Sequence, residues 1–290
     1  MKKTKILFLV NVDWFFLSHR LPIAIEAAAR GYEVHVATTV TDRAKEIQDH
    51  GFTLHEVRIS RGDASLLTSL KTFISIIKLF KNIKPHIVHL VTIKPILLGG
   101  IAARLTNIPG VIAAISGLGY IFINQGLMAS FRRFFIKLLY RFSLGHKNIK
   151  IICQNQNDLQ EIKTIAKLSD SDFSIISGSG VSLQRFKYVP DVREIPNVIM
   201  ASRLLIDKGV QEFYDAALIL KKMKLSANFI LVGETDPDNP SSISNDLINQ
   251  WKQAGIIDFW GHRENMHDVL SQASIVVLPS YREGFPKVLI

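Results

Sequence analysis

Apolar positions along the chain recur with two periods, which predict strands and helices in alternation. Short runs rich in Ile, Val and Leu predict buried strands, and segments with apolar positions three or four apart predict helices. In the first part of the chain, strands are expected at 6–11, 32–38, 52–59, 87–91, 110–116, 148–153 and 173–177. The expected helices between them occupy 21–30, 45–50, 64–81 and 96–105.

A second series of the same kind follows Pro190 and Pro196, with strands expected at 197–201, 228–232, 257–259 and 274–279 and helices at 210–223, 246–254 and 266–273. Apolar strands that alternate with helices indicate parallel sheets covered on both faces, so the fold class is α/β with two doubly wound domains. We place these domains at 1–185 and 198–290, joined by a linker at 186–197. Ligands of such sheets bind at the carboxyl ends of the strands, here in a cleft between the domains.

The start of the chain favours a cytoplasmic protein. An apolar run follows the N-terminal lysines, but Asn11 and Asp13 interrupt it and no small-residue cleavage site follows. Cys153 is the one cysteine of the chain, so no intramolecular disulfide can form. Residues 105–131 lack charged side chains and are long enough to span a bilayer. Their glycines, proline and amide side chains favour a strand followed by a loop.

The charge is unevenly divided along the chain. Residues 1–190 hold 25 Lys and Arg against 12 Asp and Glu, a formal +13, whereas residues 191–290 hold 10 against 13, or −3. This asymmetry indicates a polyanionic partner for the first part, and a merely basic, soluble surface is the alternative. Segments 66–84 and 126–142 combine Lys and Arg with Leu, Ile and Phe.

These two segments have the composition of helices that lie on an anionic membrane, which we expect at the inner face of the cell membrane. Ordinary sheet-covering helices with basic outer faces are the alternative. A nucleic-acid partner is not expected, because the basic segments are rich in large apolar residues and contain no recognised nucleic-acid motif.

A candidate anion site follows the first strand of the second series. Arg203 and Lys208 stand just before the predicted helix at 210–223. The free N–H groups of a helix N-terminus favour negative charge, and an Arg with a Lys suits a diphosphate. The alternative is surface charge near a turn. Two further strand-end turns carry Gly233 and the pair Gly261 and His262, and Glu283 lies in the last loop.

The order and spacing of these motifs resemble the donor site of family 4 glycosyltransferases with the GT-B fold. The motifs are Ser202-Arg203 with Lys208-Gly209, Phe259-Trp260-Gly261 and Glu283-Gly284-Phe285-Pro286. Further segments, at 17–24, 89–95 and 116–120, are similar to bacterial enzymes that extend lipid-linked O-antigen, capsule or N-glycan precursors.

The resemblance implies a role for each matching donor-site residue. Arg203 and Lys208 would neutralise the diphosphate of a nucleotide sugar, and Glu283 would bind the transferred sugar. The backbone at Gly261 and His262 would meet the nucleotide base, Gly233 would admit the ligand, and the loop under the sugar would be shaped by Gly284, Phe285 and Pro286. The family's second glutamate would fall one residue beyond Ile290, so we expect an incomplete second domain.

The acceptor is expected on the first domain. His19 is predicted at a strand–helix junction, where it would contact a phosphate, with a capping or core histidine as the alternative. Lys94, Ser116 and Gly117 complete the predicted acceptor site. Gly117 and Gly119 do not form a dinucleotide fingerprint, because the third glycine is missing and the site follows the fifth strand.

The resemblance also implies a retaining, metal-independent reaction that needs no cofactor. The donor would be a UDP sugar, such as an N-acetylhexosamine, and the acceptor a polyprenyl-diphosphate-linked saccharide. Two Asp-x-Asp triplets, at 170–172 and 236–238, are interpreted as solvated turns and not as metal sites. The other hypotheses are a catalytically impaired remnant that binds acceptor only and a nicotinamide-dependent oxidoreductase.

Overall fold

The computed structural model describes residues 3–59, 65–117, 127–166, 168–237, 239, 241–281, 283 and 285–290, with side chains left out for 127–135. Gly284, Asp238 and residues 118–126, which carry some of the motifs named above, lie outside this description. The chain forms two compact units, Met1–Ser179 and Gly180–Ile290.

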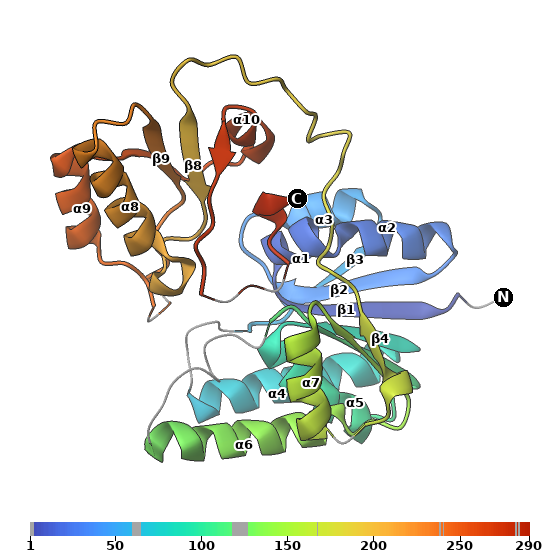
Figure 1. Cartoon of the computed structure of the whole chain (residues 1–290). Coiled ribbons are helices and arrows are strands. Elements are labelled where there is room, and N and C mark those ends of the chain that lie inside the picture. The colour runs from blue at the N-terminus through green and yellow to red at the C-terminus, as the bar shows by residue number, and fades with distance from the viewer. Residues whose placement is uncertain are drawn as a thin grey trace. The chain divides into compact units, whose positions relative to one another are not determined.

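The first unit is built on a parallel sheet of seven strands in the order β3-β2-β1-β4-β5-β6-β7 (Figure 1). The strands are β1 (Lys5–Val12), β2 (Glu33–Thr39), β3 (Thr53–Glu56), β4 (Ile87–Val91), β5 (Gly110–Ile115), β6 (Ile149–Cys153) and β7 (Phe173–Ile175). The helices are α1 (Asp13–His19), α2 (Leu21–Ala29), α3 (Ala44–Asp49), α4 (Leu66–Ile83), η1 (Pro95–Gly99), α5 (Gly100–Leu105), α6 (Leu127–Leu144), α7 (Gln156–Ala166) and η3 (Asp170–Asp172).

Helices cover both faces of this sheet, as the apolar strands predict. Phe8 and Phe16 pack edge to face, with ring centroids 5.7 Å apart, so α1 covers the same face as α2 and α3. On the other face, Leu7 and Leu9 lie in one apolar cluster with Ile76 of α4. Figure 1 shows the two helical layers on opposite sides of the strands. The α/β class and the doubly wound arrangement are confirmed.

The second unit holds a parallel sheet in the order β10-β9-β8-β11. Its strands are β8 (Asn197–Ala201), β9 (Asn228–Val232), β10 (Asp258–Gly261) and β11 (Ile275–Val276), and its helices are η4 (Ile206–Lys208), α8 (Val210–Lys222), α9 (Asn245–Ala254), α10 (Met266–Leu270) and η5 (Lys287–Leu289). Tyr214 of α8 stacks on Trp251 of α9 at 4.6 Å between ring centroids, within the core on one face. Val269 of α10 packs on the opposite face.

The structure differs from the predicted elements at short strands and helices and at α7, an eleven-residue helix that was not predicted. The helix α1 is not predicted from the sequence, because Trp14, Phe15 and Phe16 stand consecutively and show no helical period. The strand expected at 274–279 is limited to Ile275–Val276, and the helix expected at 266–273 ends at Leu270. Within the described parts of the chain, no helix combines the length and the apolarity needed to cross a bilayer.

Cys153 ends β6 and is fully buried in the core of the first unit. Burial raises the pKa of its thiol to about 12, and the negative charge of Asp158 adds to the shift. At neutral pH the side chain is therefore a protonated thiol packed among apolar neighbours, which is the inert form of cysteine.

Candidate donor and acceptor sites

The ends of β8, β9 and β10 are joined by backbone hydrogen bonds that continue past the strands. Ser202 N donates to Val232 O at 3.0 Å, and Gly233 N donates to Gly261 O at 2.9 Å. These bonds bring the turns after all three strands to one edge of the second sheet. The residues expected to bind the donor therefore lie at neighbouring strand ends, where parallel sheets bind their ligands.

Two glycines at this edge are required by close backbone approach. Gly209, at φ +76°, precedes the first residue of α8, and a Cβ on it would lie 2.3 Å from Pro279 O. Gly233, at φ +139°, would bring a Cβ to 1.8 Å from Ser202 O. Both contacts are far inside van der Waals distance, so only glycine allows the backbone segments to approach this closely at the two positions.

Lys208 and Glu283 form an ion pair at the start of α8. Lys208 Nζ lies 2.5 Å from Glu283 Oε1, and both side chains are mostly buried. A backbone hydrogen bond holds the same segments together, because Tyr281 N donates to Asp207 O at 3.0 Å. The Asp207 carboxylate in turn accepts a hydrogen bond from Ser241 Oγ at 2.9 Å. The last loop is therefore attached to η4, and a cation and a carboxylate face one another beside a helix N-terminus.

Arg203 lies at the same edge and pairs with Asp236. Its Nη1 donates to Asp236 Oδ2 at 2.8 Å; the Arg203 side chain is 48% exposed and the Asp236 side chain 15% exposed. The interpretation of Asp236 as a solvated turn residue is wrong, because its carboxylate is covered and ion-paired. Asp170, by contrast, is exposed and pairs with Lys163, and Asp172 caps the turn at Ser169.

The remaining residues expected to bind the donor lie at the periphery of this edge. Gly261 ends β10 at φ +66°, and a Cβ added to it would meet no atom within 4 Å, so space is open beside it. His262 is exposed and follows directly, Phe285 is exposed in the last loop, and Pro286 precedes η5. Phe285 and Pro286 therefore belong to the same loop as Glu283, whereas Gly261 and His262 lie at the end of β10.

In the first unit, the expected acceptor residues follow the neighbouring strands β1, β4 and β5. Ser116 and Gly117 follow β5, with Gly117 at φ +120°, and Lys94 immediately precedes η1. His19 is the last residue of α1, so it is separated from β1 by a whole short helix. The predicted position directly after the strand is wrong, because α1 begins at Asp13 without a loop. The His19 ring stacks on Phe15 at 4.0 Å, and Nδ1 lies 2.6 Å from Ser18 Oγ.

Comparison with known families identifies this arrangement. Residues 5–167 match the family model "Glycosyl transferase 4-like", and residues 195–290 match "Glycosyl transferases group 1". The chain belongs to this glycosyltransferase family. The resemblance inferred from the motifs is confirmed, and a nicotinamide-dependent oxidoreductase is no longer an alternative.

Curated relatives of this glycosyltransferase are bacterial. One is the Campylobacter jejuni N,N'-diacetylbacillosaminyl-diphospho-undecaprenol alpha-1,3-N-acetylgalactosaminyltransferase, 31% identical over 93% of this chain and 75% of that protein. Another is the Escherichia coli UDP-Gal:alpha-D-GlcNAc-diphosphoundecaprenol alpha-1,3-galactosyltransferase, 25% identical over 78% of this chain and 60% of that protein. The chain thus spans between three fifths and three quarters of the length of these relatives.

Solved structures of low identity share the fold of this glycosyltransferase. Anabaena HepE in complex with UDP and glucose superposes with a TM-score of 0.71 at 16% identity, covering 98% of this chain and 77% of that one. Sucrose-phosphate synthase from Thermosynechococcus elongatus gives 0.72 at 16% identity, covering 99% and 78%. The predicted GT-B fold is confirmed.

Sequence reasoning overlooked a buried polar group in the first unit of the glycosyltransferase. Asp13 is fully buried at the start of α1. Its carboxylate accepts hydrogen bonds from Thr41 N at 2.7 Å, Thr41 Oγ1 at 2.8 Å, Trp14 N at 2.8 Å and Arg43 N at 3.2 Å. Burial acts to raise the pKa of Asp13, but these hydrogen bonds to the charged form outweigh it and lower the pKa. In the sequence, the signal for this buried, hydrogen-bonded carboxylate is that Asp13 interrupts an apolar run.

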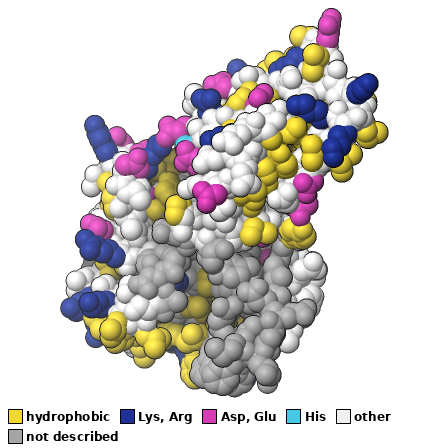
Figure 2. Space-filling model, turned by 90° about the vertical axis from the view of Figure 1, so that its left-hand side faces the viewer, with side chains coloured by type: hydrophobic (Ala, Val, Ile, Leu, Met, Phe, Trp, Pro, Cys, Tyr) yellow, Lys and Arg dark blue, Asp and Glu magenta, His cyan; other side chains and the backbone are white. Residues whose placement is uncertain are grey.

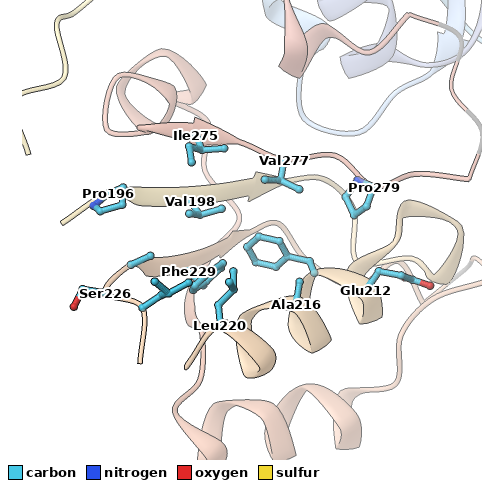
Figure 3. A pocket seen from close by; sticks show the side chains of 13 residues that line it. Pro196, Val198, Glu212, Ala216, Leu220, Ser226, Phe229, Ile275, Val277 and Pro279 are labelled. Atoms are coloured by element: carbon cyan, nitrogen blue, oxygen red, sulfur yellow. The ribbon is translucent and has the colours of Figure 1, made fainter. Parts of the chain in front are cut away.

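The second unit of the glycosyltransferase also contains an apolar pocket of about 460 Å³ between α8 and the sheet. Figure 3 shows Val198 of β8, Phe229 of β9 and Leu220 of α8 lining it. Of the described residues around it, only Glu212 and Ser226 are polar, and Glu212 accepts a hydrogen bond from the Tyr281 hydroxyl. A nucleotide needs several polar groups to orient it, so this pocket does not suit one.

Proposed function

We propose that this glycosyltransferase moves a sugar from a UDP sugar, such as an N-acetylhexosamine, to a polyprenyl-diphosphate-linked saccharide in surface polysaccharide synthesis. The observation that carries the proposal is the ion pair of Lys208 with Glu283 beside the start of α8, with Arg203 at the end of the neighbouring strand β8. The names of the relatives support it, since both enzymes act on undecaprenyl-diphosphate-linked sugars and one uses UDP-galactose.

The chemistry follows from the charges at this edge. A leaving UDP gains negative charge as the glycosidic bond breaks, and stabilising that charge lowers the barrier. Arg203 and Lys208 supply two positive charges, and the N-terminus of α8 supplies free N–H groups. Glu283 lies 2.5 Å from Lys208, and its carboxylate would accept hydrogen bonds from the hydroxyls of a sugar attached to the diphosphate.

We propose that these groups act without a metal ion and that the anomeric configuration is retained. The two cations and the helix N-terminus supply the charge neutralisation that a divalent ion provides in other sugar-nucleotide enzymes.

The other expected residues would border the two substrates. His262, with Gly233 and Gly261 beside it, would border the nucleotide, and Phe285 and Pro286 would border the sugar. On the first unit, His19, Lys94, Ser116 and Gly117 follow adjacent strands and would receive the acceptor.

We further propose attachment to the inner face of the cell membrane through the segments 66–84 and 126–142. On α4, Leu66 is 86% exposed and Leu67 72% exposed, and the exposed Lys71 follows one turn later. On α6, Leu138, Leu139 and Phe142 are exposed next to Lys137 and Arg141. Figure 2 shows hydrophobic and basic side chains together along the lower edge of one face. Such a surface suits an anionic bilayer that carries the lipid-linked acceptor.

The deciding experiment measures UDP binding by isothermal titration calorimetry. Wild type is compared with Arg203→Ala and with Lys222→Ala, a matched removal of an exposed cation at the far end of α8. We expect saturable binding by wild type and Lys222→Ala, and affinity at least about tenfold weaker in Arg203→Ala. No binding by wild type at millimolar UDP would leave an acceptor-binding remnant as the function of this chain.

A further inference from the structure

The first sheet buries a positive charge next to its topological switch point. The strand order reverses between β1 and β4, because β2 and β3 lie beyond β1 while β5, β6 and β7 lie beyond β4. Open α/β sheets bind ligands at the carboxyl ends of the strands at such a point. Arg20 joins α1, which directly follows β1, to α2, and it is only 5% exposed.

Arg20 lacks a counter-ion within the described part of the chain. Its Nη1 donates to the carbonyl oxygen of its neighbour His19 at 2.9 Å, and its buried Nε has no acceptor. Asp13, the buried carboxylate on the same short helix, is engaged by Thr41, Trp14 and Arg43. Burial lowers the pKa of Arg20 to about 10, so the guanidinium is charged at neutral pH.

His89 of β4 is a second buried polar group close to Arg20. It is 3% exposed, its ring packs against Phe8 at 5.1 Å, and its Nε2 has no hydrogen-bond partner among the described residues. Burial, followed by the charge of Arg20, lowers the pKa of His89 to about 3. A neutral imidazole offers one N–H donor and adds no charge.

A buried cation without a counter-ion is costly, because it has lost its water and gained no compensating charge. A hydrophobic side chain would fill the same space at lower cost. The cost is offset if an anion binds to the guanidinium. Phosphate oxygens match a guanidinium best, because two of its N–H groups can point at two oxygens of one phosphate.

We propose that Arg20, with His89 beside it, binds a phosphate oxygen of a diphosphate-bearing substrate on the first unit. The proposal rests on the proposed function, which supplies two such substrates, the lipid-linked acceptor and the UDP sugar. Lys94 and Ser116 follow the neighbouring strands β4 and β5, so a diphosphate held here has further polar groups along the same sheet edge.

The test isolates this site from the donor site. The full chain carrying Arg203→Ala and Lys208→Ala serves as the parent, and inorganic pyrophosphate is titrated into it by calorimetry. We expect this parent to bind pyrophosphate and the additional change Arg20→Met to weaken binding at least about tenfold. The melting temperature of the Met variant without ligand is expected to equal or exceed that of the parent, because an unpaired buried charge is removed.

A second variant guards against a folding defect. Arg20→Lys retains the charge but loses the paired N–H groups of the guanidinium. Its affinity for pyrophosphate should therefore be about five- to tenfold weaker than that of the parent. Pyrophosphate affinity unchanged within about twofold in both variants, or no pyrophosphate binding by the parent at about 10 mM, overturns the proposal.

The source of the phosphate is read from two further probes in the same parent. If Arg20→Met weakens the binding of farnesyl diphosphate, the site belongs to the acceptor. If Arg20→Met weakens the binding of UDP, the site belongs to the donor. These results are independent of the proposed donor site. Unchanged UDP affinity in Arg203→Ala alone contradicts the proposed function and leaves the pyrophosphate result at Arg20 intact.

Discussion

Lys208 Nζ lies 2.5 Å from Glu283 Oε1, although 75 positions separate the two residues in the chain. The pair joins the residue proposed to hold the diphosphate to the residue proposed to hold the sugar. Each therefore neutralises the other in the structure. An incoming diphosphate must compete with the Glu283 carboxylate for the Lys208 ammonium group.

This competition gives Glu283→Gln two opposite effects. UDP, which carries no sugar, should bind the variant about three- to tenfold more tightly, because the competing carboxylate is removed. Sugar transfer should fall by about 100-fold or more, because the charged acceptor for the sugar hydroxyls is lost. Calorimetry and a radiolabelled transfer assay measure the two effects. Lys208→Ala is the control and should weaken UDP binding. Weaker UDP binding by Glu283→Gln would instead assign Glu283 the role of orienting Lys208.

Gly233 and Gly261, at the ends of β9 and β10, predict unequal losses of stability when each is changed to Ala. Gly233→Ala places a methyl group 1.8 Å from Ser202 O, so the loop must move, and we expect unfolding to become easier by about 3 kcal/mol or more. Gly261→Ala meets no atom within 4 Å and bears only the strain of φ +66°, about 1 kcal/mol. Urea denaturation followed by Trp fluorescence compares them. Equal losses would show that backbone conformation alone, and not the close approach to Ser202, requires Gly233.

Asp13 predicts an acid-sensitive first unit. Its pKa is lower in the folded state, so its contribution to stability is fully present above the unfolded pKa of about 3.9 and is lost as the pH falls through the folded value. Asp13→Asn should cost about 2 kcal/mol at pH 7, because four hydrogen bonds lose a charged acceptor, and it should flatten the dependence of stability on pH below about 4. The exposed Asp49→Asn is the control. Parallel pH profiles for wild type and Asp13→Asn would contradict this role.

The exposed apolar residues of α4 predict membrane binding. Changing Leu66, Leu67 and Leu70 to Ser removes three large side chains that are 86%, 72% and 53% exposed. Co-sedimentation with phosphatidylglycerol vesicles should fall at least about tenfold, since each inserted side chain contributes on the order of 1 kcal/mol or more. Leu105→Ser removes one exposed leucine from α5 and should leave vesicle binding unchanged. Equal binding by the triple variant would remove α4 from the proposed membrane surface.

The central strands and long helices could be predicted from sequence because each carries a strong period. β4 occupies the predicted residues Ile87–Val91, and α8 differs from its prediction by one residue. The short helix α1 could not be predicted in this way, since three consecutive aromatic residues in a seven-residue helix carry no period. Its omission displaced His19, which was expected to follow the strand directly.

The candidate donor residues could be predicted because they belong to motifs with fixed order, and their partners could not. Asp236 lies 33 positions from Arg203, and nothing local to either residue indicates the pair. The contact arises because β8 and β9 are neighbours and end together. The charge state of Arg20 and His89 is likewise a property of the packed sheet, because burial in the fold, and not the local sequence, sets it.

The single thiol of Cys153 makes the chain a natural background for site-specific labelling. Because this side chain is sealed in the first core and protonated at neutral pH, maleimide reagents should modify cysteines introduced at the surface and leave the native residue untouched. Fluorophores can then be placed on either unit without first removing a buried side chain. The rate at which Cys153 itself reacts under native conditions then measures how often the β6 region of the sheet opens.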